Sequence, residues 1–457
     1  MKNKITFTFI FTLLVVAGLL ALYYLPPVNL GDTPLRKVDL LSDLRPDPVV
    51  EEVSDSDSIS LPVVAKPVFV DTCKTGMTCI EDYTDSLGLG MGAFYEALAN
   101  RASLGRPVRI AYFGDSFIEG DILTADLRSL FQQKFGGRGV GYVPVTSRVA
   151  GFRPTIKHTF EGWESHAVTD SSGFKRAFQD ISNHYFIPRA GASVTLKGGK
   201  NYTACLDTCE TSSFYFFSPD SVILSAQING GESKEYIFPG DSTRMQVAEA
   251  DGSIGTIRWV QQAGKHTRCF AATMDSREGV ILDNFSTRGS NGQQLAGIPM
   301  SVLKAYNRLR TYDLIVLQYG LNVASEKVMN YSYYTVEMEK VIAHLKEAFP
   351  EAAILIVGIG DRESKTETGE LHTMPGVKSL VRYQQALAAK THVAFWNMFE
   401  AMGGEGSMVE MVNSKPAMAN YDYTHINFRG GKHLANILFE ALMYGKEQYE
   451  KRKAYEN

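Results

Sequence analysis

The chain of 457 residues has no excess of basic residues, with 46 lysines and arginines against 50 aspartates and glutamates and a net charge of -4. Proteins that hold nucleic acid neutralise its phosphates with clustered positive charge, so we expect no nucleic acid partner. The sequence also has no H-E-x-x-H stretch or other metal signature, and we expect no metal or other cofactor. A single hydrophobic core stops growing at about 250 to 300 residues, so more than one domain is expected.

Cysteine is scarce, with five residues in the whole chain. Cys73 and Cys79 enclose a five-residue loop, Cys205 and Cys209 are four positions apart, and Cys269 is left over. A zinc site would need a second C-x-x-C or a histidine pair at ligand spacing, and neither is present. An oxidising compartment would allow one or two disulfides, whose connectivity the sequence leaves open.

An uncharged apolar run lies at the N-terminus. Residues 5–25, ITFTFIFTLLVVAGLLALYYL, carry no charge for 21 positions, close to the roughly 20 residues that a helix needs to cross a bilayer. Lys2 and Lys4 precede the run, so the positive-inside bias leaves the N-terminus in the cytoplasm and exports the rest. We therefore expect residues 1–25 to anchor the chain in the inner membrane, with the catalytic part on the periplasmic, extracytoplasmic side. A cleaved signal peptide is the competing interpretation, but its small-residue A-x-A site is missing.

Residues 26–85 have a different composition. They mix proline, serine and acidic residues without a period, as in RPDPVVEEVSDSDSIS. Such a stretch cannot bury enough apolar surface to fold. We expect a disordered tether that holds the folded part away from the membrane.

The stretch AYFGDSFIEGD, residues 111–121, places Ser116 between two predicted elements. Residues 108–113 have the pattern of a buried strand, and residues 122–135 have that of the next helix. The turn after a strand of an α/β unit lies at the carboxyl edge of a parallel sheet, where such proteins bind ligands. Ser116 is therefore a candidate nucleophile, and the alternative is that Asp115 or Ser116 merely caps the helix.

The C-terminal stretch YDYTHINF places Asp422 three residues before His425, just ahead of an amphipathic helix. A serine hydroxyl is a weak nucleophile until a base accepts its proton, and the base needs an acid that holds its tautomer. An aspartate and a histidine on one short loop can supply both groups. The alternative for His425 is a capping or solvated histidine.

Together these stretches resemble the first and last sequence blocks of the SGNH family, also called GDSL-type hydrolases. The first block is Gly114, Asp115 and Ser116, and the last is the Asp-x-x-His of Asp422 and His425. Any one block would be weak support. All four blocks of the family occur here, in order, beside plausible strands or helices.

The two middle blocks follow predicted strands. VILDNFSTRGSNGQQL carries Gly292 in the position of the family glycine, with Gly289 as the less favoured register. YDLIVLQYGLNVAS supplies the Gly-x-Asn of Gly320 and Asn322. The family often has an aspartate after that asparagine, whereas this chain has Val323, which puts the substrate preference in doubt more than the catalysis.

The resemblance implies a three-layer α/β/α fold around a flavodoxin-like parallel sheet and a serine esterase mechanism. Ser116 would attack an ester carbonyl, His425 would take its proton and return it to the leaving alcohol, and Asp422 would orient the imidazole. The backbone N–H groups of Ser116 and Gly292 and the side-chain amide of Asn322 would form the oxyanion hole. The G-x-S-x-G elbow of the α/β-hydrolases is absent, which argues against that rival fold.

The spacing of the blocks predicts an inserted domain. Between Ser116 and Gly292 lie 175 residues, where compact members of the family need a few dozen. Residues 146–280 change to short β-rich runs separated by turn residues, which is typical of a sandwich or jelly roll. We expect a catalytic domain formed by residues 86–145 and 281–457, interrupted by an all-β domain that resembles the carbohydrate-binding-type module of bacterial peptidoglycan O-acetylesterases. Core positions are favoured over sugar stacking for four of its aromatic residues: Trp163, Tyr185, Tyr236 and Trp259.

The expected reaction is removal of O-acetyl groups from a cell-envelope or dietary polysaccharide, with an acetylated glycan such as peptidoglycan as substrate. Asp361 and Arg362 follow a fourth predicted strand and are candidates for substrate contacts, although holding a loop is the safer interpretation. A polysaccharide O-acetyltransferase with the same triad is one alternative. A noncatalytic glycan-binding protein is another, and the complete set of catalytic residue types argues against it.

Overall fold

The structure, a computed structural model, describes these parts of the chain: residues 10–11, 29–30, 33–34, 73–84, 90–170 and 172–456. The chain divides into two units, Met1–Leu61 and Pro62–Asn457. In the first unit, Ile10 and Phe11 are helical, and strand β1 (Asn29–Leu30) pairs with β2 (Thr33–Pro34) in antiparallel fashion. Nearly all of the predicted anchor and most of the predicted tether lie outside the described residues. Within the described residues, no helix has both the length and the apolar character needed to cross a bilayer.

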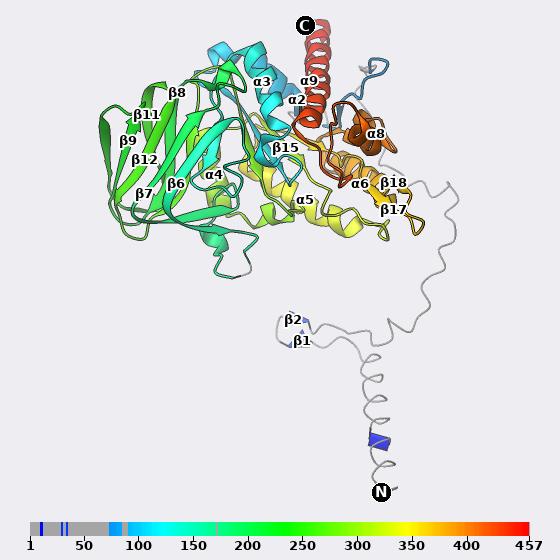
Figure 1. Cartoon of the computed structure of the whole chain (residues 1–457), viewed down its shortest axis with the longest axis horizontal. Coiled ribbons are helices and arrows are strands. Elements are labelled where there is room, and N and C mark those ends of the chain that lie inside the picture. The colour runs from blue at the N-terminus through cyan, green and yellow to red at the C-terminus, as the bar shows by residue number, and fades with distance from the viewer. Residues whose placement is uncertain are drawn as a thin grey trace. The chain divides into compact units, whose positions relative to one another are not determined.

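The second unit contains a sheet that lies among helices (Figure 1) and has one antiparallel edge strand. In spatial order its described strands are β14 (Val280–Ser286), β4 (Val108–Gly114), β15 (Leu314–Gln318), β16 (Ala353–Val357), β19 (Ala394–Trp396) and β3 (Glu81–Asp82). All neighbours are parallel except β3, which is antiparallel to β19. The parallel strands follow the flavodoxin-like order 2-1-3-4-5, as predicted. Strands β15, β16 and β19 are fully buried, which explains their continuous apolar runs.

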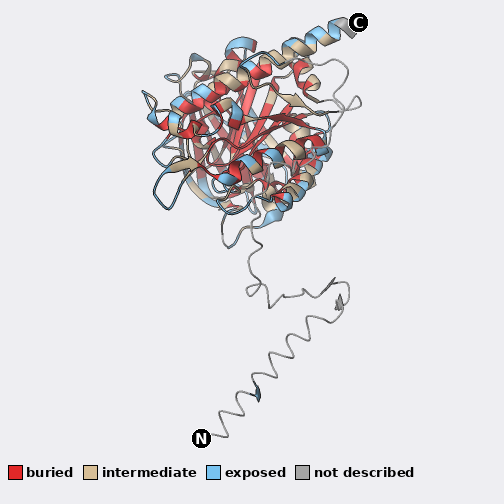
Figure 2. Cartoon of the chain, turned by 90° about the vertical axis from the view of Figure 1, so that its right-hand side faces the viewer, coloured by how far each residue is buried: buried red, intermediate tan, exposed pale blue. Residues whose placement is uncertain are grey.

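Helices cover both faces of this sheet, which confirms the three-layer arrangement. One face carries α2 (Gly90–Ala99), α3 (Thr124–Phe135) and α9 (Phe428–Glu456), and the other carries α4 (Met300–Arg310), α5 (Ser332–Ala348) and α6 (Pro375–Thr391). In Figure 2 the strands are mostly buried, while the outward sides of the helices are exposed. The shorter elements are α7 (Met398–Met402), α8 (Ser407–Asn413), β17 (Glu363–Lys365), β18 (Leu371–Thr373) and the 3₁₀ helices Arg101–Ser103, Glu119–Asp121, Arg176–Phe178, Ala204–Leu206 and Gln293–Gly297.

The edge of the sheet corrects the predicted end of the tether at residue 85. Residues 73–84 belong to the folded unit, because β3 extends the sheet and a disulfide joins Cys73 to Cys79. The indole N–H of Trp396 donates to the Thr78 carbonyl (3.0 Å), which holds the segment against β19. The carboxylate of Asp82 accepts the Met91 N–H (2.9 Å) at the start of α2.

The strands between β4 and β14 form a separate antiparallel sheet. They are β5 (Gly141–Pro144), β6 (Ile156–Ala167), β7 (His184–Gly198), β8 (Cys209–Ser218), β9 (Val222–Ile228), β10 (Ser233–Phe238), β11 (Asp241–Ile254), β12 (Thr256–Ala263) and β13 (Arg268–Met274). The sheet branches, because β7 pairs with β6, β12 and β13. It has a hydrophobic core of its own. The structure thus has one branched antiparallel sheet over residues 141–274, where a sandwich or jelly roll over residues 146–280 was expected.

The side chains of the insert agree with the predicted core positions. Trp259 and Tyr185 are buried, and Trp163 and Tyr236 are half-buried against the core of the antiparallel sheet. Cys205, Cys209 and Cys269 are free thiols, so of the one or two disulfides expected, one is present.

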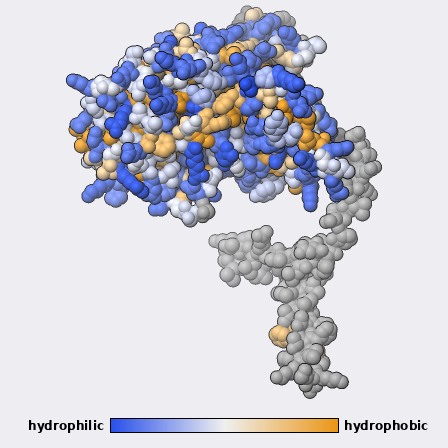
Figure 3. Space-filling view, in the orientation of Figure 1, coloured by the Kyte–Doolittle hydropathy of each residue, from blue (hydrophilic) through white to orange (hydrophobic). Residues whose placement is uncertain are grey.

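A buried arginine joins the two sheets. Arg310, at the end of α4, bonds both carboxylate oxygens of Asp275 (2.6 and 3.0 Å), just after β13. Its Nε and Nη2 donate to the two oxygens of Asp283 on β14 (2.5 and 2.7 Å), so that Nη2 is shared between the two carboxylates. The face of the molecule in Figure 3 is mostly hydrophilic, with smaller hydrophobic patches.

Candidate active site

Ser116 lies in the turn that follows β4, at the carboxyl edge of the parallel sheet. The side chain of Asp115 stabilises this turn by accepting the N–H of Phe117 (2.9 Å). Helix α3 begins later, at Thr124, with Leu123 in the capping position. Neither Asp115 nor Ser116 therefore caps the helix, and the Ser116 hydroxyl is available for another partner.

That partner is His425. The Ser116 Oγ lies 2.9 Å from Nε2 of His425, and Nδ1 of the same ring lies 2.8 Å from Oδ2 of Asp422. An ionised carboxylate can only accept, so the ring proton belongs on Nδ1, and Nε2 is free to accept the serine proton. The structure thus brings together the three residues of the predicted triad in the order that acyl transfer requires.

The loop that carries His425 and Asp422 owes its shape to local backbone bonds. Tyr423 adopts a left-handed conformation, with φ of 53°. The N–H of Asn420 donates to the His425 carbonyl (2.8 Å), which closes the loop. Oδ1 of Asp422 accepts the backbone N–H of His425 (2.9 Å), so the aspartate bonds both ends of the histidine that it orients.

The carboxyl groups of Asp422, in the triad, and of Asp115, beside it, have opposite pKa shifts. Partial burial alone would raise the pKa of Asp422, but the hydrogen bonds from His425 hold it below its ordinary value. Burial raises the pKa of Asp115 to about 6, against the lowering effect of the Phe117 N–H and of His425. Asp422 therefore stays ionised, as a partner for an imidazolium ion must.

Gly292 lies at the start of the 3₁₀ helix Gln293–Gly297 in the left-handed region, with φ of 89°. A Cβ atom at this position would lie 2.7 Å from the ring of Tyr319, so glycine is required by conformation and by space. The Gly292 N–H, the predicted oxyanion donor, donates to the Ser290 hydroxyl (3.0 Å). It can serve a substrate oxygen only when that bond is exchanged or shared. Gly289, the less favoured register, has open space around it.

Asn322 follows β15 and contacts the first and second blocks. Its side-chain amide donates to the Ser290 carbonyl (2.8 Å) and approaches the Asp115 carboxylate (3.4 Å). These contacts fix the amide beside the nucleophile turn and the Gly292 loop. Val323 packs against the core of the parallel sheet and provides no polar group there.

The structure gives Asp361 and Arg362, the candidates for substrate contacts, partners in the surrounding loops. Asp361 is fully buried, and its oxygens accept the Thr373 hydroxyl and the Met408 N–H (both 2.8 Å). Arg362 donates to the Leu321 carbonyl (2.7 Å) and so holds the backbone next to the Gly-x-Asn block. Both residues hold loops, which is the safer of the two interpretations made above.

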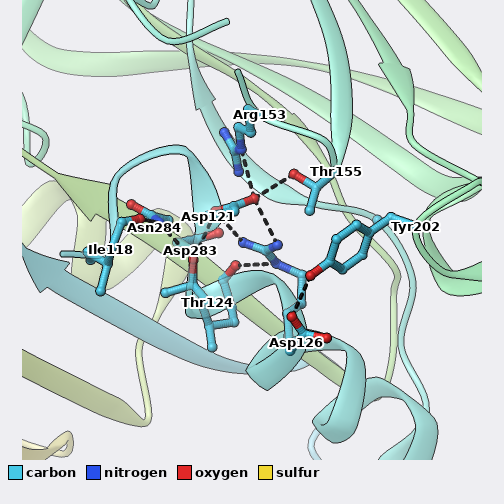
Figure 4. Close-up of polar contacts among 12 residues, drawn as sticks. Ile118, Asp121, Thr124, Asp126, Arg153, Thr155, Tyr202, Asp283 and Asn284 are labelled. Atoms are coloured by element: carbon cyan, nitrogen blue, oxygen red, sulfur yellow. Dashed lines mark hydrogen bonds and ion pairs between the residues drawn. The ribbon is translucent and has the colours of Figure 1, made fainter. Parts of the chain in front are cut away.

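Sequence reasoning missed several residues that hold the site. Ser290 bonds both Gly292 and Asn322, and it lies inside the second block, between the two candidate glycines Gly289 and Gly292. Asn284 on β14 donates to the Ile118 carbonyl (2.8 Å) and to the Thr124 hydroxyl (2.7 Å), both in the nucleophile turn and its helix (Figure 4). No local sequence signal identifies Asn284, because its partners lie about 160 positions away.

A parallel sheet of this order, with a serine after its first strand and an Asp-x-x-His loop before its last helix, has the architecture of the SGNH-type ester hydrolases. Within the described residues, no group of three or more histidine, cysteine or acidic side chains is placed to hold a metal ion. The triad and its donors are the chemical groups that the site offers.

One solved structure agrees with this fold over most of the chain. The chain is similar to a peptidoglycan O-acetylesterase, with a TM-score of 0.64 and 20% identity over 80% of this chain and 99% of that one. A family two carbohydrate esterase from Cellvibrio japonicus covers 66% of this chain and 98% of its own, at 9% identity and a TM-score of 0.24. A family two carbohydrate esterase from Clostridium thermocellum, in complex with cellohexaose, matches 59% of this chain and 97% of its own. Its identity is 10% and its TM-score is 0.25. No protein-family model and no curated protein matches the sequence. The chain thus has the SGNH fold that the sequence predicts.

Proposed function

We propose that the protein is an exported serine esterase that removes O-acetyl groups from a cell-envelope polysaccharide, with peptidoglycan as the favoured substrate. One observation carries the proposal: the continuous hydrogen-bonded chain from Ser116 through His425 to Asp422, at the edge of the sheet where the SGNH fold places it. The likeness to a peptidoglycan O-acetylesterase over 80% of the chain supports the choice of glycan.

The reaction has two steps. Ser116 attacks the acetyl carbonyl while Nε2 of His425 takes the hydroxyl proton, and the C–O bond to the sugar breaks as His425 returns that proton to the sugar oxygen. A water molecule then attacks the acetyl-serine with His425 as base, which releases acetate and restores the hydroxyl. The N–H of Ser116, the N–H of Gly292 and the Asn322 amide would stabilise the negative oxygen in both steps, each worth about 2.7 to 4 kcal/mol.

Location and domain roles are part of the proposal. The uncharged run of residues 5–25 would anchor the chain in the inner membrane, with the catalytic domain on the exported side. The antiparallel sheet would be the counterpart of a carbohydrate-binding-type β-sandwich and would contact the glycan.

The experiment is product analysis with the full-length protein, O-acetylated peptidoglycan and a non-acetylated glycan acceptor. The proposal predicts that free acetate accounts for all the acetyl groups lost. Acetyl groups that appear on the acceptor instead would assign the protein as a transferase, because the same acyl-enzyme would then be partitioned away from water. Binding of the glycan with no change in its acetyl content would assign a noncatalytic protein.

A further inference from the structure

The loop between β5 and β6 leaves the antiparallel sheet and contacts the nucleophile turn. Phe152, in this loop, packs its ring on Gly120, four residues after Ser116. Gly120 has φ of 64°, and a Cβ atom there would lie 2.7 Å from the Phe152 ring. Glycine at this position therefore allows the insert to approach the backbone beside the nucleophile.

Phe152 also contacts the other half of the site. Its ring centroid lies 5.3 Å from that of Phe428, with the planes tilted by 39°. Phe428 begins α9, three residues after His425. The aromatic pair of Phe152 and Phe428 thus lies between the turn that carries the nucleophile and the loop that carries the base.

A buried ion cluster fixes the position of this loop (Figure 4). Asp121, in the nucleophile turn, accepts the Nε of Arg153 (2.8 Å) and the hydroxyl of Thr155 (2.5 Å), both from the insert. Arg128 of α3 donates to the same carboxylate (3.1 Å). Burial would raise the pKa of Asp121, but the two arginines hold it well below its ordinary value, so the cluster stays charged. The residue next to Phe152 is therefore anchored in the catalytic domain.

Phe152 is nevertheless 54% exposed. A ring that is anchored and still faces solvent can bind a ligand with little further loss of conformational freedom. The backbone under the ring continues into charged groups, since Glu119, adjacent to Gly120, is paired with the exposed Arg288. One apolar ring face bordered by charged side chains suits a pyranose, which has an apolar C–H face and a hydroxyl rim. A lipid acyl chain would need a longer apolar surface.

We propose that Phe152, with Phe428 beside it, is a subsite that stacks on a sugar ring of the glycan chain next to the acetylated residue. The insert then contributes directly to substrate selection, through one residue at the edge of the active site. This inference rests on the proposed esterase function and adds a specificity-determining residue to it.

The test is Phe152→Ala in the full-length protein, with kcat/KM measured on soluble O-acetylated peptidoglycan fragments and on 4-nitrophenyl acetate, which has no sugar. The ratio of interest is kcat/KM on the peptidoglycan fragments divided by kcat/KM on 4-nitrophenyl acetate. Loss of a stacking contact should lower this ratio by about five- to tenfold, and Phe152→Tyr should restore it. Phe160→Ala is the matched control, because Phe160 is an exposed phenylalanine of the same sheet whose ring contacts His158 instead. It should leave the ratio unchanged.

A second measurement separates this inference from the esterase proposal. Ser116→Ala and the double variant Ser116→Ala/Phe152→Ala are compared for sedimentation with insoluble O-acetylated peptidoglycan, a readout that needs no turnover. Weaker sedimentation of the double variant is the expected result. Equal sedimentation of the two variants would overturn the subsite. An equal loss of activity on both substrates in Phe152→Ala would also overturn it, because the ring would then only support the nucleophile turn. A wild type that binds through Phe152 but releases no acetate would refute the esterase proposal alone.

Discussion

Asp115 and Ser116 are neighbours with different tasks. The Asp115 carboxyl is buried and holds the turn through the Phe117 N–H, while the Ser116 hydroxyl is bonded to the imidazole of His425. The sequence Gly-Asp-Ser therefore combines a carboxyl group that holds the turn with a hydroxyl group that is bonded to the imidazole. Asn322, which reaches toward Asp115 and bonds Ser290, connects that turn to the loop of Gly292.

Asp422 is a residue at which catalysis and stability can be separated. Its side chain is 50% exposed, and its main contacts are with His425 and Thr424. We expect Asp422→Asn to fold normally, because an amide oxygen can still accept backbone N–H groups. The amide cannot stabilise an imidazolium ion, so kcat on 4-nitrophenyl acetate should fall by about 10³ to 10⁴.

The matched control is Glu367→Gln, which neutralises an exposed acidic side chain in the β17–β18 turn. It should leave kcat within twofold. If Asp422→Asn retained more than a tenth of the wild-type kcat, Asp422 would not be the residue that orients the base.

At this scale the sequence predicted the triad because Asp422 and His425 lie on one loop and their partner lies in a recognisable turn. It could not predict Ser290 or Asn284, whose partners come from other strands. It also placed Asp361 and Arg362 correctly at the end of β16 but not the direction of their side chains. That direction depends on Met408 of α8 and on Leu321 in the loop after β15, which are their partners.

The β17–β18 hairpin supports the catalytic loop. The N–H of Glu363, on β17, donates to the carbonyl of Tyr423 (3.0 Å). Tyr423 directly follows Asp422 in the loop that carries His425. The Glu363 side chain is buried, and neither of its carboxyl oxygens has a hydrogen-bond partner within the described residues. Burial first, and then the nearby Asp361 and Glu405 carboxylates, raise the pKa of Glu363 from 4.5 to about 7.

The sign of the resulting pH dependence follows from this direction. Since the folded chain binds the Glu363 proton more tightly than the unfolded chain, the stability from this group is present below pH 4.5 and is lost as the pH rises through 7. Glu363→Gln cannot ionise. We expect the melting temperature of the wild type to fall relative to that of Glu363→Gln between pH 4.5 and 7, as measured by thermal unfolding from pH 4 to 9.

The same variant tests the link to the catalytic loop. Because ionised Glu363 would repel Asp361 and loosen β17, Glu363→Gln should retain a larger share of its kcat than the wild type between pH 7 and 9. If the melting temperatures of the two proteins differ by the same amount at every pH from 4 to 9, Glu363 does not change its charge in that range.

The regular elements were largely predictable, since the strand at residues 108–113 and the helix at residues 122–135 match β4 and α3 within two residues. Strand β3 was not. It is two residues long, lies in a stretch poor in apolar residues, and exists because it pairs with β19 and is held by a disulfide and by Trp396. Such a strand depends on tertiary contacts and has no pattern of its own.

At the scale of the whole molecule, Arg310 joins the insert to the catalytic domain through Asp275 and Asp283. All three side chains are buried. Arg310→Leu would leave two buried carboxylates without their cation, so we expect a loss of about 3 to 5 kcal/mol in the free energy of unfolding, measured by urea denaturation.

Arg308→Leu is the control for this variant. Arg308 is exposed in the same last turn of α4, and its removal should change the unfolding free energy by less than about 0.5 kcal/mol. Equal effects of the two substitutions would mean that the Arg310 cluster does not stabilise the junction.

The sequence predicted an all-β insert from its spacing and its turn-rich pattern, and the structure has one antiparallel sheet between β4 and β14. The branching of the sheet and the contact of its Phe152 and Arg153 with the nucleophile turn could not be predicted, because they depend on how two separately patterned domains pack. The cluster around Asp121 is an example. Its arginine, threonine and aspartate residues have no distinguishing pattern in the sequence, and the fold buries them together.

The most direct test of the account is acetate release from O-acetylated peptidoglycan by the full-length protein, beside Ser116→Ala. The account predicts steady release by the wild type and a fall in kcat on the order of 10⁴ to 10⁶ in Ser116→Ala. Release at equal rates from both proteins, or none from the wild type on any acetylated glycan, would contradict the assignment of Ser116 as the nucleophile of an esterase.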